Sequence, residues 1–235
     1  MSSKLIVEAK QIVIPGDTLA EGMDFLPGRG AFREGEKVFS SQVGLVNVSG
    51  GRVIHIIPLA GPFIPKANDT VIGTIRDMSY SSWFVNIGCP YDASLSLRDA
   101  SSDFIERGAS LSDYFAVGDV ILTKITNVTK ELNIDLTMKG PGLRKLKGGM
   151  VIQIPSSKVP RVVGKQGSMI SMLKEKTGCT VFAGQNGRIW IRGTTPQTEK
   201  LASDAIMLIA EKSHMSGLTE KISTFLDEGA KELKK

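Results

Sequence analysis

The sequence contains little cysteine and little histidine. Its two cysteines, Cys89 and Cys179, lie too far apart to form a disulfide framework or the paired ligands of a zinc site. The two histidines, His55 and His214, fall in different segments, and no Ser/His/Asp or Cys/His arrangement can be built around them. The acidic residues between positions 99 and 113 are spread along a predicted loop and form no cluster that would hold a metal ion: Asp99, Asp103, Glu106 and Asp113. We therefore expect a protein that is not an enzyme and that has no cofactor, no metal and no small-molecule substrate.

Long apolar runs are also missing. No stretch approaches the roughly 20 residues that a membrane span requires, and residues 1–10 carry charges where a signal peptide would be apolar. We expect no membrane partner and a cytoplasmic location. With 41% hydrophobic and 23% charged residues, the chain can still bury a core. At roughly 150 residues per domain, 235 residues allow one large domain or two to three small ones.

The net charge of +5 is unevenly distributed. Residues 1–66 carry +1, residues 67–140 carry −4 and residues 141–235 carry +8. Within 141–192 there are ten basic residues and a single acid, Glu175. A basic segment of this kind is typical of a surface that binds a polyanion, since association releases condensed counterions. A solvated surface without a ligand is the alternative.

The pattern of apolar runs and turns divides the chain into four parts. Residues 1–66 are rich in glycine and proline, and the runs Leu5–Ile14, Val43–Val48 and Arg52–Ile57 predict a β-barrel or β-sandwich. His55, between two isoleucines, is interpreted as a surface or half-buried side chain. Residues 67–140 contain five candidate strands, which favours an OB-fold barrel: 71–76, 82–87, 93–97, 120–127 and 134–137. A short helix is possible between residues 99 and 114.

The third part, residues 149–213, predicts the order β-α-α-β-β-α. The strands are 150–154, 180–183 and 188–191, and the second helix is 168–177, ended by Gly178. The last helix of this part begins with Thr195 as N-cap and Pro196 at its first position. The fourth part, residues 214–235, keeps a helical period of apolar residues. We expect this tail helix to pack on its own protein, with docking to a partner as the alternative.

One motif carries the functional prediction. Gly164-Lys165-Gln166-Gly167 stands between the two adjacent helices and is flanked by Val163 and by Ser168-Met169-Ile170. The glycines let the backbone turn sharply and let a sugar–phosphate chain approach closely, because no Cβ intervenes. Ser168 begins a helix, so free amides and the positive end of the helix dipole point at the same place. Lys165 adds a positive charge. A turn between packed helices that binds nothing is the alternative.

This motif, in this order of elements, resembles the GXXG loop of a type I KH domain. The resemblance implies binding of single-stranded RNA at Gly164, Lys165, Gln166 and Gly167, with bases held across the loop and the neighbouring strand. The further candidate RNA contacts in this domain are Ile154, Arg161, Val163 and Arg188. Trp190, on the last strand, is interpreted as a core residue rather than a stacking platform.

Residues 67–140 resemble the S-one type of OB-fold. The similarity rests on the runs Val71–Ile75, Trp83–Gly88, Tyr91–Leu97 and Val117–Val120. Phe84 matches the exposed aromatic that stacks on bases in that family, with core packing as the alternative. Ser96 stands where many such domains have histidine. Because this segment is acidic, RNA contacts would have to come from a local patch, for which Arg98 and Lys124 are the candidates.

The complete chain resembles the ribosomal-RNA-processing protein four family of archaeal exosome cap subunits. The run Ile12-Val13-Ile14-Pro15-Gly16-Asp17-Thr18-Leu19 is similar to the N-terminal signature of that family. The resemblance implies three copies on a hexameric ring of RNase PH-like subunits, with residues 1–66 gripping the ring and RNA passing through its pore to catalytic sites in the ring. An RNA-binding factor of translation or the ribosome, without a ring, is the alternative.

Overall fold

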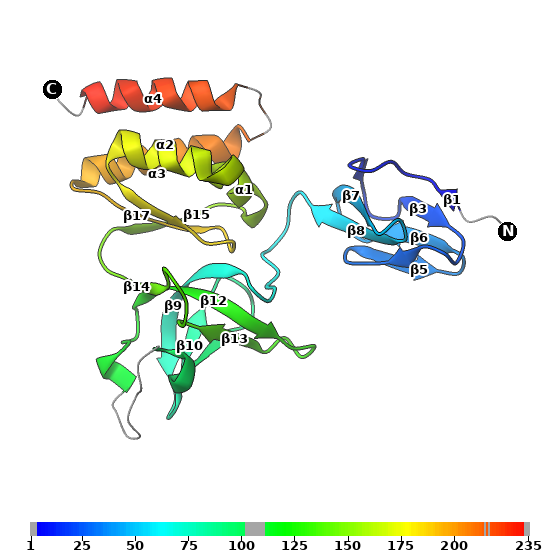
Figure 1. The fold of residues 1–235 in the computed structure, drawn as a ribbon, viewed down its shortest axis with the longest axis horizontal. Coiled ribbons are helices and arrows are strands. Elements are labelled where there is room, and N and C mark those ends of the chain that lie inside the picture. The colour runs from blue at the N-terminus through cyan, green and yellow to red at the C-terminus, as the bar shows by residue number, and fades with distance from the viewer. Residues whose placement is uncertain (1–3, 102–110, 214, 216, 233–235) are drawn as a thin grey trace. The chain divides into compact units, whose positions relative to one another are not determined.

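The computed structural model describes residues 4–101, 111–213, 215 and 217–232 (Figure 1). The chain forms two compact units, Met1–Gly61 and Pro62–Lys235. The first unit ends inside the proline-containing stretch that follows the last strand of the N-terminal part. The barrel and the helical domain both belong to the second unit.

The first unit contains two four-stranded sheets. One has the order β1-β3-β6-β5, formed by β1 (Lys4–Leu5), β3 (Thr18–Glu21), β6 (Lys37–Ser40) and β5 (Ala31–Glu34). The other has the order β2-β7-β8-β4, formed by β2 (Ile12–Val13), β7 (Gly44–Ser49), β8 (Val53–Pro58) and β4 (Leu26–Pro27). Leu19 and Val38 of one sheet pack in one core with Val46 and Ile54 of the other. The predicted β-rich sandwich is confirmed.

One strand prediction in this unit is wrong. Residues 5–14 do not form a single strand: β1 and β2 belong to different sheets, and the chain turns between them. Lys10 has a φ of 68°, in the left-handed region that a continuous strand does not contain. The apolar residues of this run are therefore divided between the two sheets. His55 is half-buried, as expected, and its Nδ1 accepts a hydrogen bond from the Arg29 amide.

The second unit begins with a closed five-stranded barrel, which confirms the OB-type prediction. Its strands are β9 (Thr70–Met78), β10 (Ser82–Asn86), β11 (Ala93–Ser96), β12 (Val120–Val128) and β13 (Ile134–Thr137). They follow the order β13-β11-β10-β9-β12, and pairing of β12 with β13 closes the barrel. Alternate residues such as Ile75, Trp83 and Ile121 fill its interior. The possible helix between 99 and 114 lies largely outside the described residues; η1 (Leu97–Asp99) and η2 (Leu111–Asp113) flank that gap.

A sixth strand, β14 (Arg144–Leu146), pairs with β12 and was not predicted. It leads into a three-stranded sheet of order β15-β17-β16, built from β15 (Met150–Gln153), β17 (Arg188–Arg192) and β16 (Thr180–Ala183). After η3 (Ser156–Lys158), the helices are α1 (Val159–Val163), α2 (Ser168–Thr177) and α3 (Pro196–Glu211), with η4 (Lys165–Gly167) between α1 and α2. The order β-α-α-β-β-α is confirmed. Thr195 caps α3, and its partner in the capping box is Thr198.

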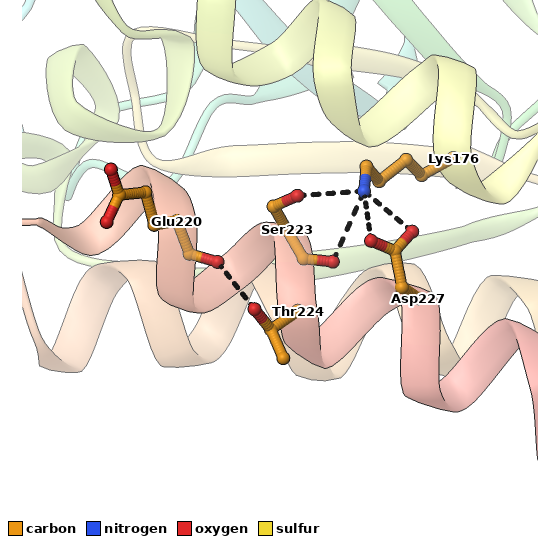
Figure 2. Close-up of polar contacts among 5 residues, drawn as sticks. All are labelled: Lys176, Glu220, Ser223, Thr224 and Asp227. Atoms are coloured by element: carbon orange, nitrogen blue, oxygen red, sulfur yellow. Dashed lines mark hydrogen bonds and ion pairs between the residues drawn. The ribbon is translucent and has the colours of Figure 1, made fainter.

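The tail helix α4 (Leu218–Glu232) packs on α2 and α3 of the same chain, which confirms the intramolecular prediction (Figure 1). Leu218, Ile222 and Leu226 are almost completely buried in the core of this domain. Figure 2 shows the polar contact that joins α4 to the end of α2. The Lys176 ammonium donates to the Ser223 hydroxyl at 2.8 Å and to both Asp227 carboxylate oxygens at 2.6 Å.

We expect Asp227→Asn to lower the free energy of unfolding by less than about 1 kcal/mol. The reason is exposure: the Asp227 side chain is 55% accessible, so water screens its charge, although Lys176 is only 26% accessible. Urea denaturation measures the change. Ile222→Ala, which empties a core position, serves as the comparison and should cost about 2–5 kcal/mol. An Asp227→Asn effect as large as that of Ile222→Ala would contradict this account.

Candidate nucleic-acid interface

The loop between α1 and α2 is open to solvent. Gly164 (φ 76°) and Gly167 (φ 81°) both take up conformations that L side chains rarely adopt, and Gln166 (φ 51°) lies between them in the left-handed region. The Lys165 and Gln166 side chains are exposed. The loop is therefore not covered by neighbouring side chains, and a polymer can reach it.

Gly164 is required by space as well as by conformation, whereas Gly167 is required by its conformation alone. A Cβ on Gly164 would come within 2.8 Å of the Met169 backbone nitrogen, whereas one on Gly167 would meet only Ile170 Cγ2, at 3.9 Å. Gly167 is the N-cap of α2 and supplies no side-chain cap. The Ser168 amide donates to the Lys165 carbonyl, and the amides that follow it in this ten-residue helix have no side-chain cap at a place where a ligand oxygen can approach. This geometry suits a phosphate.

The flanking candidates fall into two groups. Arg161 is exposed, and one guanidinium nitrogen donates to the Met215 carbonyl at 3.1 Å. Val163 is half-buried beside the loop. Ile154 is different: it is 2% exposed and belongs to the core beneath α1 and α2. An aliphatic side chain packed in the core has no free surface for a base, so the structure does not support Ile154 as a direct RNA contact.

Arg188 is engaged by the barrel. Its two terminal nitrogens donate to the carbonyl and the side-chain oxygen of Asn86, at 2.6 and 2.7 Å. Burial lowers the pKa of the Arg188 guanidinium from its ordinary value, although the group remains charged. No carboxylate among the described residues pairs with this cation. Arg188 therefore joins two domains, and an RNA contact would use only the donors that Asn86 leaves free.

Asn186, which the sequence suggested only as part of a turn, is the centre of this junction. It is 1% exposed. Its amide nitrogen donates to the Ile72 carbonyl at 2.8 Å and the Ile87 carbonyl at 2.7 Å, and its side-chain oxygen accepts from the Ile72 amide at 3.3 Å. The β16–β17 turn closes through a hydrogen bond from the Gly187 amide to the Gly184 carbonyl. A Cβ on Gly184 would come within 2.8 Å of the Ile72 nitrogen, so glycine permits this close approach.

An apolar cluster extends the same junction. Trp190 packs with Ile72 and Leu122 of the barrel and with Leu146 of β14. The indole nitrogen of Trp190 donates to the Gly148 carbonyl at 2.8 Å. Trp190 is thus a core residue, as interpreted from the sequence, but the core is the one shared by the barrel and the sheet. The barrel and the β15-β17-β16 sheet are thus joined by an apolar cluster and by the hydrogen bonds of Asn186 and Arg188.

We expect Asn186→Ala to lower the free energy of unfolding of the second unit by about 2–4 kcal/mol. The substitution leaves buried backbone groups of Ile72 and Ile87 without partners, and each such group costs about 1–3 kcal/mol. Urea denaturation measures the change. Gln185→Ala is the matched control, since this neighbouring side chain is exposed and should contribute within about 0.5 kcal/mol. Equal stability of the two variants would show that the junction does not depend on Asn186.

On the barrel, Phe84 is 39% exposed and projects from β10 between Asp77 of β9 and Ser94 of β11. Arg98 is exposed on η1. Lys124 is half-buried on β12 opposite Thr70 of β9. Ser96 donates to Asp99. The structure thus leaves Phe84 available for stacking but places an acid next to it.

No group of three or more metal-binding side chains occurs among the described residues. Of the predicted acidic stretch, Asp103 and Glu106 lie outside those residues, as does His214. Within the described part of the chain, no helix is long and apolar enough to cross a membrane.

Comparison with known proteins gives consistent matches. Residues 149–197 match the KH domain family model, and residues 10–60 match the model of the exosome RNA binding protein RRP4 N-terminal domain. The exosome complex component Rrp4 of Pyrococcus furiosus is 43% identical over 234 residues, 98% of this chain and 88% of the relative. The component of the same name from Methanosarcina acetivorans is 42% identical over 217 residues, 92% of this chain and 82% of the relative.

A solved structure described as an exosome complex RNA-binding protein is also similar. It superposes with a TM-score of 0.67 at 35% identity, and the match covers 74% of this chain and all of that one.

Proposed function

Because this chain belongs to the Rrp4 family of exosome components, we propose that it is the RNA-binding cap subunit of an archaeal exosome and that it has no catalytic activity of its own. The observation that carries the proposal is the exposed GXXG loop in front of the uncapped N-terminus of α2. Backbone amides, a helix dipole and Lys165 meet there, and together they bind phosphate without reading a particular base. RNA binding of this kind has little sequence preference.

The second part of the proposal is that the first unit binds a protein partner. Residues 10–60 match the N-terminal domain model of this family, and large apolar side chains are exposed on this unit: Ile12, Ile14, Met23, Leu26 and Ile57. Ile12 of β2 and Ile57 of β8 both pair with Leu45 of β7, so their exposed side chains lie on one face of that sheet, and a contiguous exposed apolar patch favours a protein partner. We infer that this unit docks on a hexameric ring of RNase PH-like subunits, with three caps per ring. The cap then captures RNA and passes it to catalytic sites in the ring.

The test is a pull-down with the tagged full-length chain from its own organism, followed by mass spectrometry of untagged partners. We expect RNase PH-like ring subunits in stoichiometric amounts. Ribosomal proteins or translation factors without ring subunits would support the alternative, a ribosome-associated RNA-binding factor. Recovery of the chain without any partner would contradict both the exosome assignment and the ribosome assignment, since each requires a stable partner.

A further inference from the structure

Two cations converge on one aromatic ring at the junction of the barrel and the KH domain. The guanidinium carbon of Arg144 lies 5.4 Å from the centroid of the Phe182 ring, and the Lys174 ammonium lies 5.5 Å from the same centroid. Arg144 belongs to β14, which pairs with the barrel, whereas Lys174 belongs to α2 and Phe182 to β16. Three separate elements therefore build this cluster.

Among the described residues, no carboxylate lies within ion-pair distance of Arg144 or Lys174. Their neighbours in sequence are paired: Lys145 with Asp119, and Lys176 with Asp227 (Figure 2). The ring attracts each cation and keeps it in place, but it does not remove the charge. Two positive charges without carboxylate partners are thus held close together, and such a pair attracts an anion.

The cluster lies at an open sheet edge. β16 pairs only with β17, so its other edge has no strand partner among the described residues. Val181 packs toward the helices, whereas Phe182 points toward the barrel and stacks on Trp190. Since α2 covers the face occupied by Val181, the Lys174 side chain reaches the ring across the edge of β16. The two cations thus lie where an extended chain would run along this strand.

The same surface continues to the GXXG loop. Lys174 follows the first residue of α2 by six positions, a rise of roughly 9 Å along the helix. Ile170 lies one turn before Lys174 on the same face of α2 and is half-buried. It is also the residue nearest to a side chain placed on Gly167. A polymer held at the loop therefore meets an apolar position and then the cationic cluster.

We propose that Arg144 and Lys174 bind backbone phosphates of an RNA whose neighbouring nucleotides are held at the GXXG loop. The inference rests on the proposed RNA-binding function and adds a second phosphate site, to which β14, next to the barrel, contributes the arginine. The RNA-binding surface of the KH domain is then completed by a residue that lies outside the domain. Phe182 positions both cations and makes no contact with the RNA itself.

The test compares a four-nucleotide and a twelve-nucleotide oligouridylate by fluorescence anisotropy at several salt concentrations. The KH loop clamps about four nucleotides, so only the longer RNA also reaches the second site. In the full-length chain, Arg144→Gln with Lys174→Gln should weaken binding of the twelve-nucleotide RNA about tenfold. The slope of log affinity against log salt should become shallower by about 0.7–1.4, for one or two lost phosphate contacts. Binding of the four-nucleotide RNA should not change.

The matched control removes the exposed Lys200 of α3 and the exposed Lys212, the C-cap of that helix, by Lys200→Gln with Lys212→Gln, which changes the net charge equally. Equal loss in both double variants would overturn the proposal, because the effect would then be one of net charge. An equal loss of affinity for the four-nucleotide and the twelve-nucleotide RNA would also overturn the proposal. Such a result would mean that the substitutions loosen the edge of β16 and thereby disturb the GXXG loop. Arg144→Lys with Lys174→Arg keeps both charges and should retain the wild-type salt slope.

A failure of the proposed RNA-binding function would give a different binding result from a failure of the second site alone. If the wild-type chain binds neither RNA, or if Lys165→Asp with Gln166→Asp in the GXXG loop has no effect, RNA binding by this domain is refuted, and the second site is refuted as well. If the Lys165 and Gln166 variant binds neither RNA, while the Arg144 and Lys174 variant has the same RNA affinity as the Lys200 and Lys212 control, only the second site is refuted.

Discussion

Replacement of Lys165 and Gln166 by aspartate is expected to weaken single-stranded RNA binding by about a hundredfold. Both side chains are exposed in the loop, so the fold does not depend on them. The substitutions place two negative charges at the phosphate site, beside the first amides of α2. A charged hydrogen bond contributes about 1.5–3 kcal/mol, and each 1.4 kcal/mol corresponds to a factor of ten in affinity. Fluorescence anisotropy at several salt concentrations measures the loss, and the salt slope should also become shallower.

The control for this prediction makes the same substitutions elsewhere. Gln197 is exposed in the first turn of α3 and Lys200 is exposed just after that turn, near the helix N-terminus, where aspartate is favourable for the helix. Gln197→Asp with Lys200→Asp therefore introduces an equal charge change in the same domain without touching the loop. We expect its RNA affinity to fall much less. Unchanged affinity of the loop variant would remove the GXXG loop as a functional site.

The GXXG loop was predictable from the sequence because everything that defines it is local. Two glycines, a lysine and the start of a helix stand within a few positions, and their backbone conformations follow from residue type. The strands of the barrel were predictable for the same reason, since alternating apolar residues fix both their limits and the inward face. These features require no knowledge of distant contacts.

The junction was not predictable, because its partners are far apart in the sequence. Asn186 binds Ile72 across 114 positions, and Arg188 binds Asn86 across 102. From the sequence, a basic residue on a KH strand indicated RNA, and Asn-Gly indicated only a turn. In the structure, Arg188 also hydrogen-bonds to Asn86 of the barrel, and Asn186, which does stand in that turn, is buried against the barrel as well. Ile154 shows the same limit: an apolar residue next to a predicted binding loop can serve the core rather than the surface.

The N-terminal part shows a second kind of limit. The apolar run of residues 5–14 has the composition of one strand, but the turn at Lys10 divides it between two sheets. Composition does not reveal which sheet a short strand joins, because pairing depends on partners elsewhere in the chain. Strands of two to four residues are too short to show the alternation of apolar and polar residues that identifies a strand. For this reason β3, β4, β5 and β6 are not predicted from the sequence.

Deletion of residues 1–61 is expected to abolish assembly with the ring while leaving RNA affinity within about twofold of that of the full-length chain. The basis is the division of the chain into two compact units, with the exposed apolar side chains on the first and the GXXG loop on the second. The second unit retains its own cores in the barrel and the KH domain, so it should remain folded. Gel filtration with purified ring subunits measures assembly, and anisotropy measures RNA binding.

The loop variant gives the reciprocal result, and the pair of experiments separates the two proposed roles. Lys165→Asp with Gln166→Asp should assemble with the ring as the wild-type chain does, since its changes lie outside the first unit. If the truncated chain still co-elutes with the ring, docking uses the second unit, and the exposed apolar residues of the first unit need another partner. If truncation abolishes RNA binding although circular dichroism shows a folded protein, the first unit contributes to the RNA site and the two roles are not separate.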